Sequence, residues 1–129
     1  MPDLRRWLVV TAVAFVAFAP PIVVLGLIHD ARESGRRAAL EEYAAAIVRG
    51  DAQHVYYGLC RARRARTSPE EVAEELRREA DRLGGVEGFC FTRGMVVFYG
   101  PEGEDRRTIR SSREAGEWRQ CPARSAIGD

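Results

Sequence analysis

The feature that most constrains this chain is an apolar stretch of 22 residues, Trp7 to Ile28, that contains no charged side chain. A helix rises about 1.5 Å per residue, so the stretch would extend about 33 Å, and the hydrocarbon core of a bilayer is about 30 Å thick. Arg5 and Arg6 precede it, and charged residues return at Asp30. The sequence therefore predicts a transmembrane helix over residues 7–28 behind a short cytoplasmic tail, residues 1–6.

A cleaved secretory signal is the alternative for this segment. Ala17-Phe18-Ala19 matches the small-residue pattern of a cleavage site. Pro20 would follow the cut, where its fixed φ and missing N–H fit a protease cleft poorly. The apolar run also continues to Ile28, longer than a signal needs. These two features favour an uncleaved anchor.

The residues after the anchor predict one small domain outside the cytoplasm. We expect a linker over residues 29–37, a domain over 38–122 and a flexible tail over 123–129. From Asp30 onward, 18 Arg balance 18 Asp and Glu, which argues against a nucleic-acid binder. Basic residues flank the anchor on both sides, so the positive-inside rule does not decide its orientation. The short N-terminal tail and the cysteines behind the anchor favour an extracytoplasmic domain at the cell membrane.

The first half of the domain has helical periodicity. Apolar residues from Leu40 to Val48 recur at helical spacing before Gly50, and Asp51 can cap a second helix that reaches Cys60. A third helix has an N-cap at Ser68, Pro69 in its first turn and Glu71 as the return half of a capping box. Gly84-Gly85 ends that helix.

The second half has the pattern of strands. We expect them over residues 86–92, 95–99, 106–113 and 117–121, with a tight reversal at Arg93-Gly94 and a polar turn over 100–105. Helices followed by an antiparallel meander indicate an α+β domain in which helices cover one face of a sheet. Its core would include the aromatic residues of the strands, namely Phe89, Phe91, Phe98, Tyr99 and Trp118.

The chain resembles the small NTF2-like domains found behind single membrane anchors in actinobacterial proteins, which are grouped with lumazine-binding-like and SnoaL-like families. The resemblance covers roughly residues 38–122 and lies in the segments 43–51, 68–71 and 117–121. It implies a curved sheet wrapped by helices into a cone that holds a small ligand or mediates association. Four expected strands are few for a sheet that encloses a deep pocket.

Three cysteines suit an oxidising compartment better than a metal site, because they form no C-x-x-C pair and have no histidine nearby. We favour a disulfide between Cys60 and Cys121, which leaves Cys90 over. Three buried free thiols are the alternative.

The residues suggest a binding site more readily than a catalytic one. We find no nucleophile motif, phosphate loop, metal site or cofactor site, and no carboxylate that would orient His54 as a base. An aromatic pocket is the sharper hypothesis, and ordinary core packing is the simpler one. The candidate residues for the aromatic pocket are His54, Tyr56, Phe89, Phe91 and Trp118.

A dense basic segment provides candidate contacts to anionic lipid headgroups, namely Arg61, Arg63, Arg64 and Arg66. Salt bridges to the acidic residues Glu70, Glu71, Glu74 and Glu75 are the alternative.

These patterns favour a membrane-anchored binding or assembly module, more readily a non-enzyme than an enzyme. Its expected partners are the lipid bilayer and an envelope protein, without nucleic acid, and a homodimer is left open. A small-molecule binder or cyclase-like enzyme that uses His54 is a second hypothesis. A pilin-like secretion subunit is a third, which the missing pilin processing pattern disfavours.

Overall fold

The computed structural model describes the backbone of residues 2–123 and the side chains of residues 22–123. The chain divides into two units, residues 1–35 and residues 36–129. The division lies close to the expected start of the domain at residue 38. Helices come first and antiparallel sheets follow, so the α+β class is confirmed.

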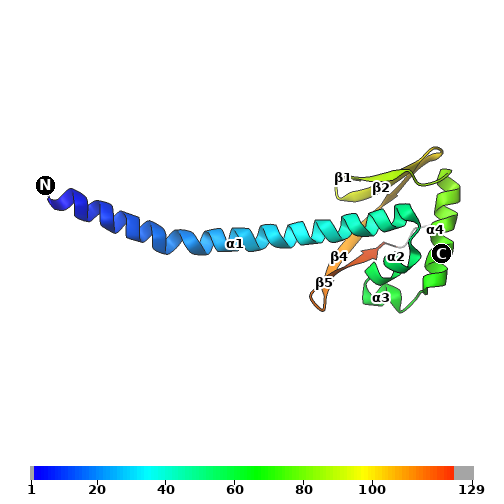
Figure 1. The fold of residues 1–129 in the computed structure, drawn as a ribbon, viewed down its shortest axis with the longest axis horizontal. Coiled ribbons are helices and arrows are strands. Elements are labelled where there is room, and N and C mark those ends of the chain that lie inside the picture. Colours follow the sequence, from blue (N-terminus) through cyan, green and yellow to red (C-terminus); the bar gives the residue numbers. More distant parts are fainter. Residues whose placement is uncertain (1, 124–129) are drawn as a thin grey trace. The chain divides into compact units, whose positions relative to one another are not determined.

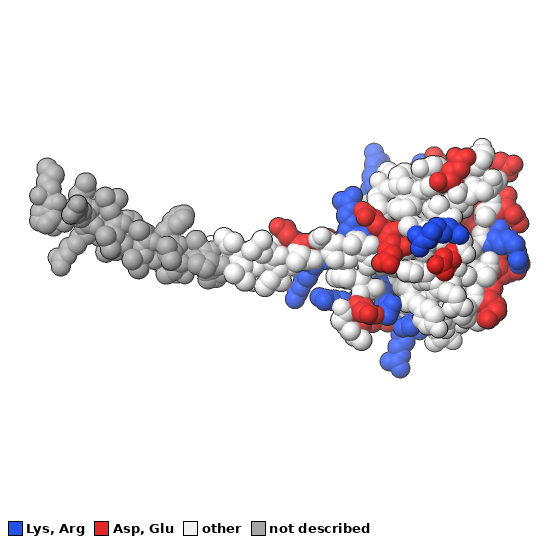
Figure 2. All heavy atoms as spheres, viewed as in Figure 1, with Lys and Arg blue, Asp and Glu red and all other residues white. Residues whose placement is uncertain are grey.

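Helix α1 spans Pro2–Arg49, so the expected linker over residues 29–37 is helical as well. At its first described side chains the helix is apolar and exposed, from Ile22, which is 72% exposed, to Ile28, which is 45% exposed (Figure 2). Residues 7–21 of the expected anchor lie outside the described side chains. Within the part whose side chains are described, no helix is long and apolar enough to cross a membrane.

The second unit contains residues 36–49 of α1 and three further helices, α2 (Ala52–Gly58), α3 (Arg61–Arg64) and α4 (Pro69–Leu83) (Figure 1). Asp51 caps α2 through a hydrogen bond from the His54 backbone N–H, and the Ser68 hydroxyl accepts from the Glu71 N–H at the start of α4. The Glu71 carboxylate does not complete a capping box. It accepts a hydrogen bond from the Thr67 hydroxyl instead.

Helix α2 ends earlier than expected, at Gly58, because the next two residues pair with a distant strand. Leu59 forms a parallel bridge with Gln120, and the Cys60 N–H donates to the Gln120 carbonyl at 2.8 Å. This contact draws the chain out of the helix, and α3 then starts as a separate turn. Sequence periodicity gave no sign of α3.

The strands form two antiparallel sheets. One has the order β1-β2-β3, from Gly88–Thr92, Met95–Gly100 and Gly103–Arg107, and the other pairs β4 (Ile109–Glu114) with β5 (Glu117–Pro122). The expected strand over 106–113 was therefore wrong. It is two strands joined at Thr108, and each enters a different sheet.

The expected polar turn over 100–105 was also wrong, because a two-residue turn at Pro101-Glu102 connects β2 to β3. Gly103 has a φ of +148°, which glycine adopts readily. This conformation lets β3 begin three residues earlier than we expected.

The core lies between the helices and the three-stranded sheet. Ala44 and Ala46 of α1 are fully buried, and Val96 and Phe98 of β2 are 1% and 2% exposed. Side chains alternate across a strand, so Tyr99 lies on the opposite face of the sheet from Phe98 and is 40% exposed. Its expected place in the core was wrong.

Candidate functional site

A cavity of about 640 Å³ lies among α1, α2, α4 and the β3–β4 connection. Its apolar wall comes from residues of the core, namely Tyr43, Ile47, Val55, Leu59, Val72 and Leu76. Charged residues line it as well, among them Arg63, Arg66 and Glu75. We call this the first cavity.

Tyr43 lines the first cavity and is 5% exposed. Burial raises the pKa of its hydroxyl to about 12, because the phenolate would lose its hydration. The positive charges of Arg107 and Arg63 act in the opposite direction, and Glu75 reinforces the rise. The tyrosine is therefore neutral at physiological pH and contributes a polar group to an otherwise apolar wall.

An ionic network stands beside the first cavity and joins α4 to β3. The Arg107 guanidinium is 2.7 Å from the Asp105 carboxylate and 3.0 Å from that of Glu79. Arg82 contacts the same two acids at 3.2 Å and 2.9 Å. Glu79 therefore fixes α4 to the sheet.

Partial burial is the largest single influence on the pKa of Asp105 and raises it, since it disfavours the charged carboxylate. The hydrogen bond and the charge of Arg107, together with hydrogen bonds to Glu79 and Arg82, outweigh burial, so the pKa of Asp105 is lowered overall. The acid stays ionised within the network.

A second cavity of about 660 Å³ lies among α1, α2 and the β4–β5 hairpin. His54, Tyr57 and Trp118 line it. The His54 Nε2 is 3.1 Å from a carboxylate oxygen of Glu42 on α1. The sequence prediction that no carboxylate orients His54 was therefore wrong. The sequence does not predict Glu42 as the partner, because Glu42 lies on another helix.

Gln120 also lines the second cavity, although it is only 1% exposed. Its Oε1 accepts a hydrogen bond from the Ser111 hydroxyl at 2.6 Å. Its Nε2 is buried and has no hydrogen-bond partner among the described residues. No pattern in the sequence predicts the burial of Gln120, because it depends on the pairing of β5 with β4.

The five pocket candidates do not share one site. His54 and Trp118 line the second cavity, while Tyr56, Phe89 and Phe91 line neither. The two phenylalanine rings meet edge to face with their centroids 5.6 Å apart, and the Arg37 guanidinium lies 5.9 Å from the centre of the Phe91 ring. These rings pack against the core.

The basic segment divides between different places. Arg63 and Arg66 line the first cavity, and the Arg61 backbone N–H donates to the Glu114 carboxylate at 2.9 Å. In residues 22–123 no ion pair joins the segment to Glu70, Glu71, Glu74 or Glu75; the carboxylate of Glu74 pairs with Arg77 instead. The contact of this segment with lipid stays a prediction.

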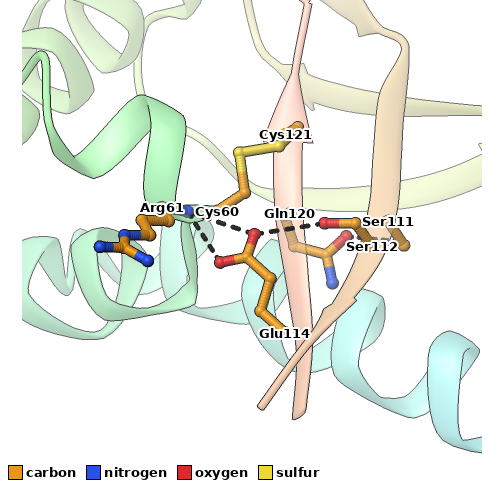
Figure 3. Close-up of a disulfide and its surroundings, with 7 residues drawn as sticks. All are labelled: Cys60, Arg61, Ser111, Ser112, Glu114, Gln120 and Cys121. Carbon is orange, nitrogen blue, oxygen red and sulfur yellow. Dashed lines mark hydrogen bonds between the residues drawn. A yellow bond between two sulfur atoms is a disulfide. The ribbon is translucent and has the colours of Figure 1, made fainter. Parts of the chain in front are cut away.

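A disulfide joins Cys60 and Cys121, with their Cα atoms 5.4 Å apart (Figure 3). Cys60 directly precedes α3, and Cys121 belongs to β5. The bond therefore fixes the start of α3 to the two-stranded sheet next to the Arg61–Glu114 contact. Cys90 is a free, exposed thiol on β1.

The charges of the second unit are mixed rather than segregated. Acidic and basic atoms are interspersed over the face that Figure 2 shows. Among the described residues, no group of three or more His, Cys, Asp or Glu could hold a metal ion.

Comparison of the chain with family models, with curated proteins and with solved structures finds no match.

Proposed function

We propose that the protein is a single-pass membrane protein whose extracytoplasmic α+β domain, with an NTF2-like fold, serves as a binding or assembly module. The exposed apolar surface of α1 is the observation that supports the anchor. Within the apolar stretch, Ile22, Leu25 and Leu27 are each more than 60% exposed, although their side chains point in different directions around one helix. Exposure of apolar surface to water costs about 25 cal/mol of free energy per Å², whereas lipid solvates such a surface well.

The disulfide supports the location of the domain. Such bonds persist in oxidising compartments and are rare in the reducing cytosol. The Cys60–Cys121 bond closes a long loop between residues 61 apart in the sequence. An extracytoplasmic domain is the simplest setting for it.

The first cavity supports the binding role. Its volume of about 640 Å³ falls within the range of ligand pockets, about 300–1,000 Å³. An apolar wall beside charges of both signs, Arg63 and Arg66 with Glu75, suits a compact ligand with an apolar group and a polar end. The chain passes from one sheet to the other at Thr108, which is compatible with the curved sheet of an NTF2-like cone.

The free thiol gives a direct test of anchor and topology. We expect the full chain to stay in membranes through a carbonate wash, and Cys90 to react in intact cells with a membrane-impermeant maleimide. The matched control is Cys90→Ser, which leaves no free thiol because Cys60 and Cys121 are bonded. Release by carbonate would overturn the anchor, and labelling only after permeabilisation would overturn the extracytoplasmic location.

A second candidate function rests on the His54–Glu42 contact. A histidine held by a carboxylate at the edge of a cavity is the arrangement of a general base. If the domain is an enzyme, His54→Ala should abolish complementation of a strain that lacks the protein. Tyr56→Phe is the control, because Tyr56 lines neither cavity. Full complementation by His54→Ala would eliminate the catalytic role.

A further inference from the structure

Strand β1 is a free sheet edge without charge. It pairs with β2 on one side only, and its sequence from Gly88 to Thr92 contains no charged residue. Natural proteins protect sheet edges with charges, and the other edge strands carry them. β3, β4 and β5 carry charged residues, and β2 lies between two neighbours.

The turn that follows β1 fixes which backbone groups face outward. Arg93 and Gly94 have φ values of +48° and +77°, as a two-residue type I′ turn requires. In such a hairpin Thr92 and Met95 form a hydrogen-bonded pair, and bonded and non-bonded pairs then alternate. The N–H and C=O groups of Phe89 and Phe91 therefore point away from β2.

Those four outward groups have no partner in the described part of the chain. No hydrogen bond outside the β1–β2 ladder involves the backbone of Phe89 or Phe91. The edge thus presents two donors and two acceptors at the spacing of a strand. A strand with the same spacing would satisfy all of them.

We propose that the chain forms a two-fold homodimer in which β1 pairs antiparallel with β1 of a second copy, centred on Cys90. In this register Phe89 lies opposite Phe91 of the second copy, and four backbone hydrogen bonds form. The three-stranded sheets of the two copies become one continuous six-stranded sheet. The dimer goes beyond the proposed function and does not depend on the anchor.

Charge complementarity favours a second copy over another partner. Glu87 and Arg93 flank β1, three residues before and after Cys90, so the two-fold axis brings the acidic end of each β1 to the basic end of the other. Both are exposed, and neither forms an ion pair or side-chain hydrogen bond among the described residues. The dimer therefore places opposite charges together at both ends of the joined strands.

The register also determines where the free thiols lie. Cys90 pairs with Val97 on the β2 side, so at the outer edge it occupies a non-hydrogen-bonded position. Opposite residues at such positions have Cα atoms about 4.5 Å apart. The two Cys90 thiols therefore lie next to each other on the exposed face of the joined sheet.

Thiol crosslinking of the full chain tests the dimer. With a short bismaleimide, which adds to both thiols without any redox step, we expect a product of twice the chain's mass. The matched control is Cys90→Ser combined with Thr92→Cys. It places the two thiols about 14 Å apart, at about 3.4 Å per residue, and should crosslink poorly with the same reagent.

A charge-reversal cycle tests the register. Glu87→Arg or Arg93→Glu alone brings like charges together at both ends of the two-fold interface. Either variant should weaken the dimer about tenfold. The double reversal restores both attractions and should restore crosslinking.

Absence of a crosslinked dimer, a product that contains another protein, or a double variant no better than the single ones would overturn the proposal. The carbonate result is independent. A carbonate-resistant monomer contradicts the dimer alone, and a dimer that carbonate releases contradicts the anchor alone.

Discussion

At the residue scale, one buried and one half-buried polar group link the second unit to pH. Tyr43 carries a hydroxyl in an apolar wall, and Asp105 carries a carboxylate between two guanidinium groups. Burial disfavours the charged form of the first, and the ion pairs favour the charged form of the second. The two residues should therefore limit stability at opposite ends of the pH scale.

Tyr43→Phe should abolish a loss of stability in alkali. The folded pKa is about 12 and the ordinary value is 10.0, so the stabilisation is complete below pH 10 and is lost as the pH rises towards 12. A difference of that size is worth about 2–3 kcal/mol. Urea unfolding between pH 8 and pH 11 measures the first half of this loss, about 1.4 kcal/mol, with Tyr99→Phe as the exposed control. An equal alkaline loss in Tyr43→Phe would contradict the assignment.

Asp105→Asn should abolish part of the loss of stability in acid. The folded pKa lies below the ordinary value of 3.8, so the contribution is complete above that value and is lost as the pH falls from it through the lower folded pKa. At pH 7 the variant should lose about 1–3 kcal/mol, since Arg107 and Arg82 lose a charged acceptor. Glu104→Gln, on the exposed neighbouring position, should cost less than about 0.5 kcal/mol. Equal effects would argue against the network.

At the element scale, long-range links hold short elements in place. The disulfide joins the start of α3 to β5, and the Glu79–Arg107 pair joins α4 to β3. A third link joins the end of β2 to the loop after α4. Gly100 allows it, because a Cβ atom at this position would lie 2.0 Å from the Gly85 carbonyl oxygen. Helix α3 has only four residues, so its position depends on such contacts rather than on helix propensity.

Removal of the disulfide should cost about 4 kcal/mol of unfolding free energy, because the bond closes a loop between residues 61 apart. The variant is Cys60→Ser with Cys121→Ser, and chemical denaturation under non-reducing conditions measures the difference. Cys90→Ser is the control and should change stability by less than about 0.5 kcal/mol. A double variant as stable as the native chain would show that the bond constrains nothing.

At the scale of the whole molecule, the division at residue 35 separates a helical segment from a unit with its own core. Every residue of that core, from Tyr43 to Ile109, belongs to the second unit. The unit has about the size of a small independent domain.

A chain that lacks residues 1–28 should therefore fold and stay in solution. We expect one cooperative urea transition that circular dichroism and tryptophan fluorescence report at the same midpoint, with Trp118 as the only remaining tryptophan. The full chain in detergent is the reference. Aggregation or a gradual transition would mean that folding of the unit requires the first segment.

The sequence by itself determined much of what depends on neighbours within one turn of the chain, although the Glu71 half of the capping box did not form. The Ser68 and Asp51 caps, the αL glycine after α4 and the tight reversal at Arg93-Gly94 all followed from residue type and spacing. Helices before antiparallel strands followed from the two periodicities. We favoured a Cys60–Cys121 disulfide because the cysteines suit an oxidising compartment, and the structure contains this bond.

Only the tertiary structure decided what depends on residues far apart in the sequence. The early end of α2 depends on Gln120, the orientation of His54 on Glu42, and the role of Glu79 on Arg107. The break between β3 and β4 depends on which sheet each strand joins. Local spacing encodes hydrogen bonds within a turn, whereas contacts between elements exist only after the chain has collapsed around a shared core, and no pattern along the sequence records them.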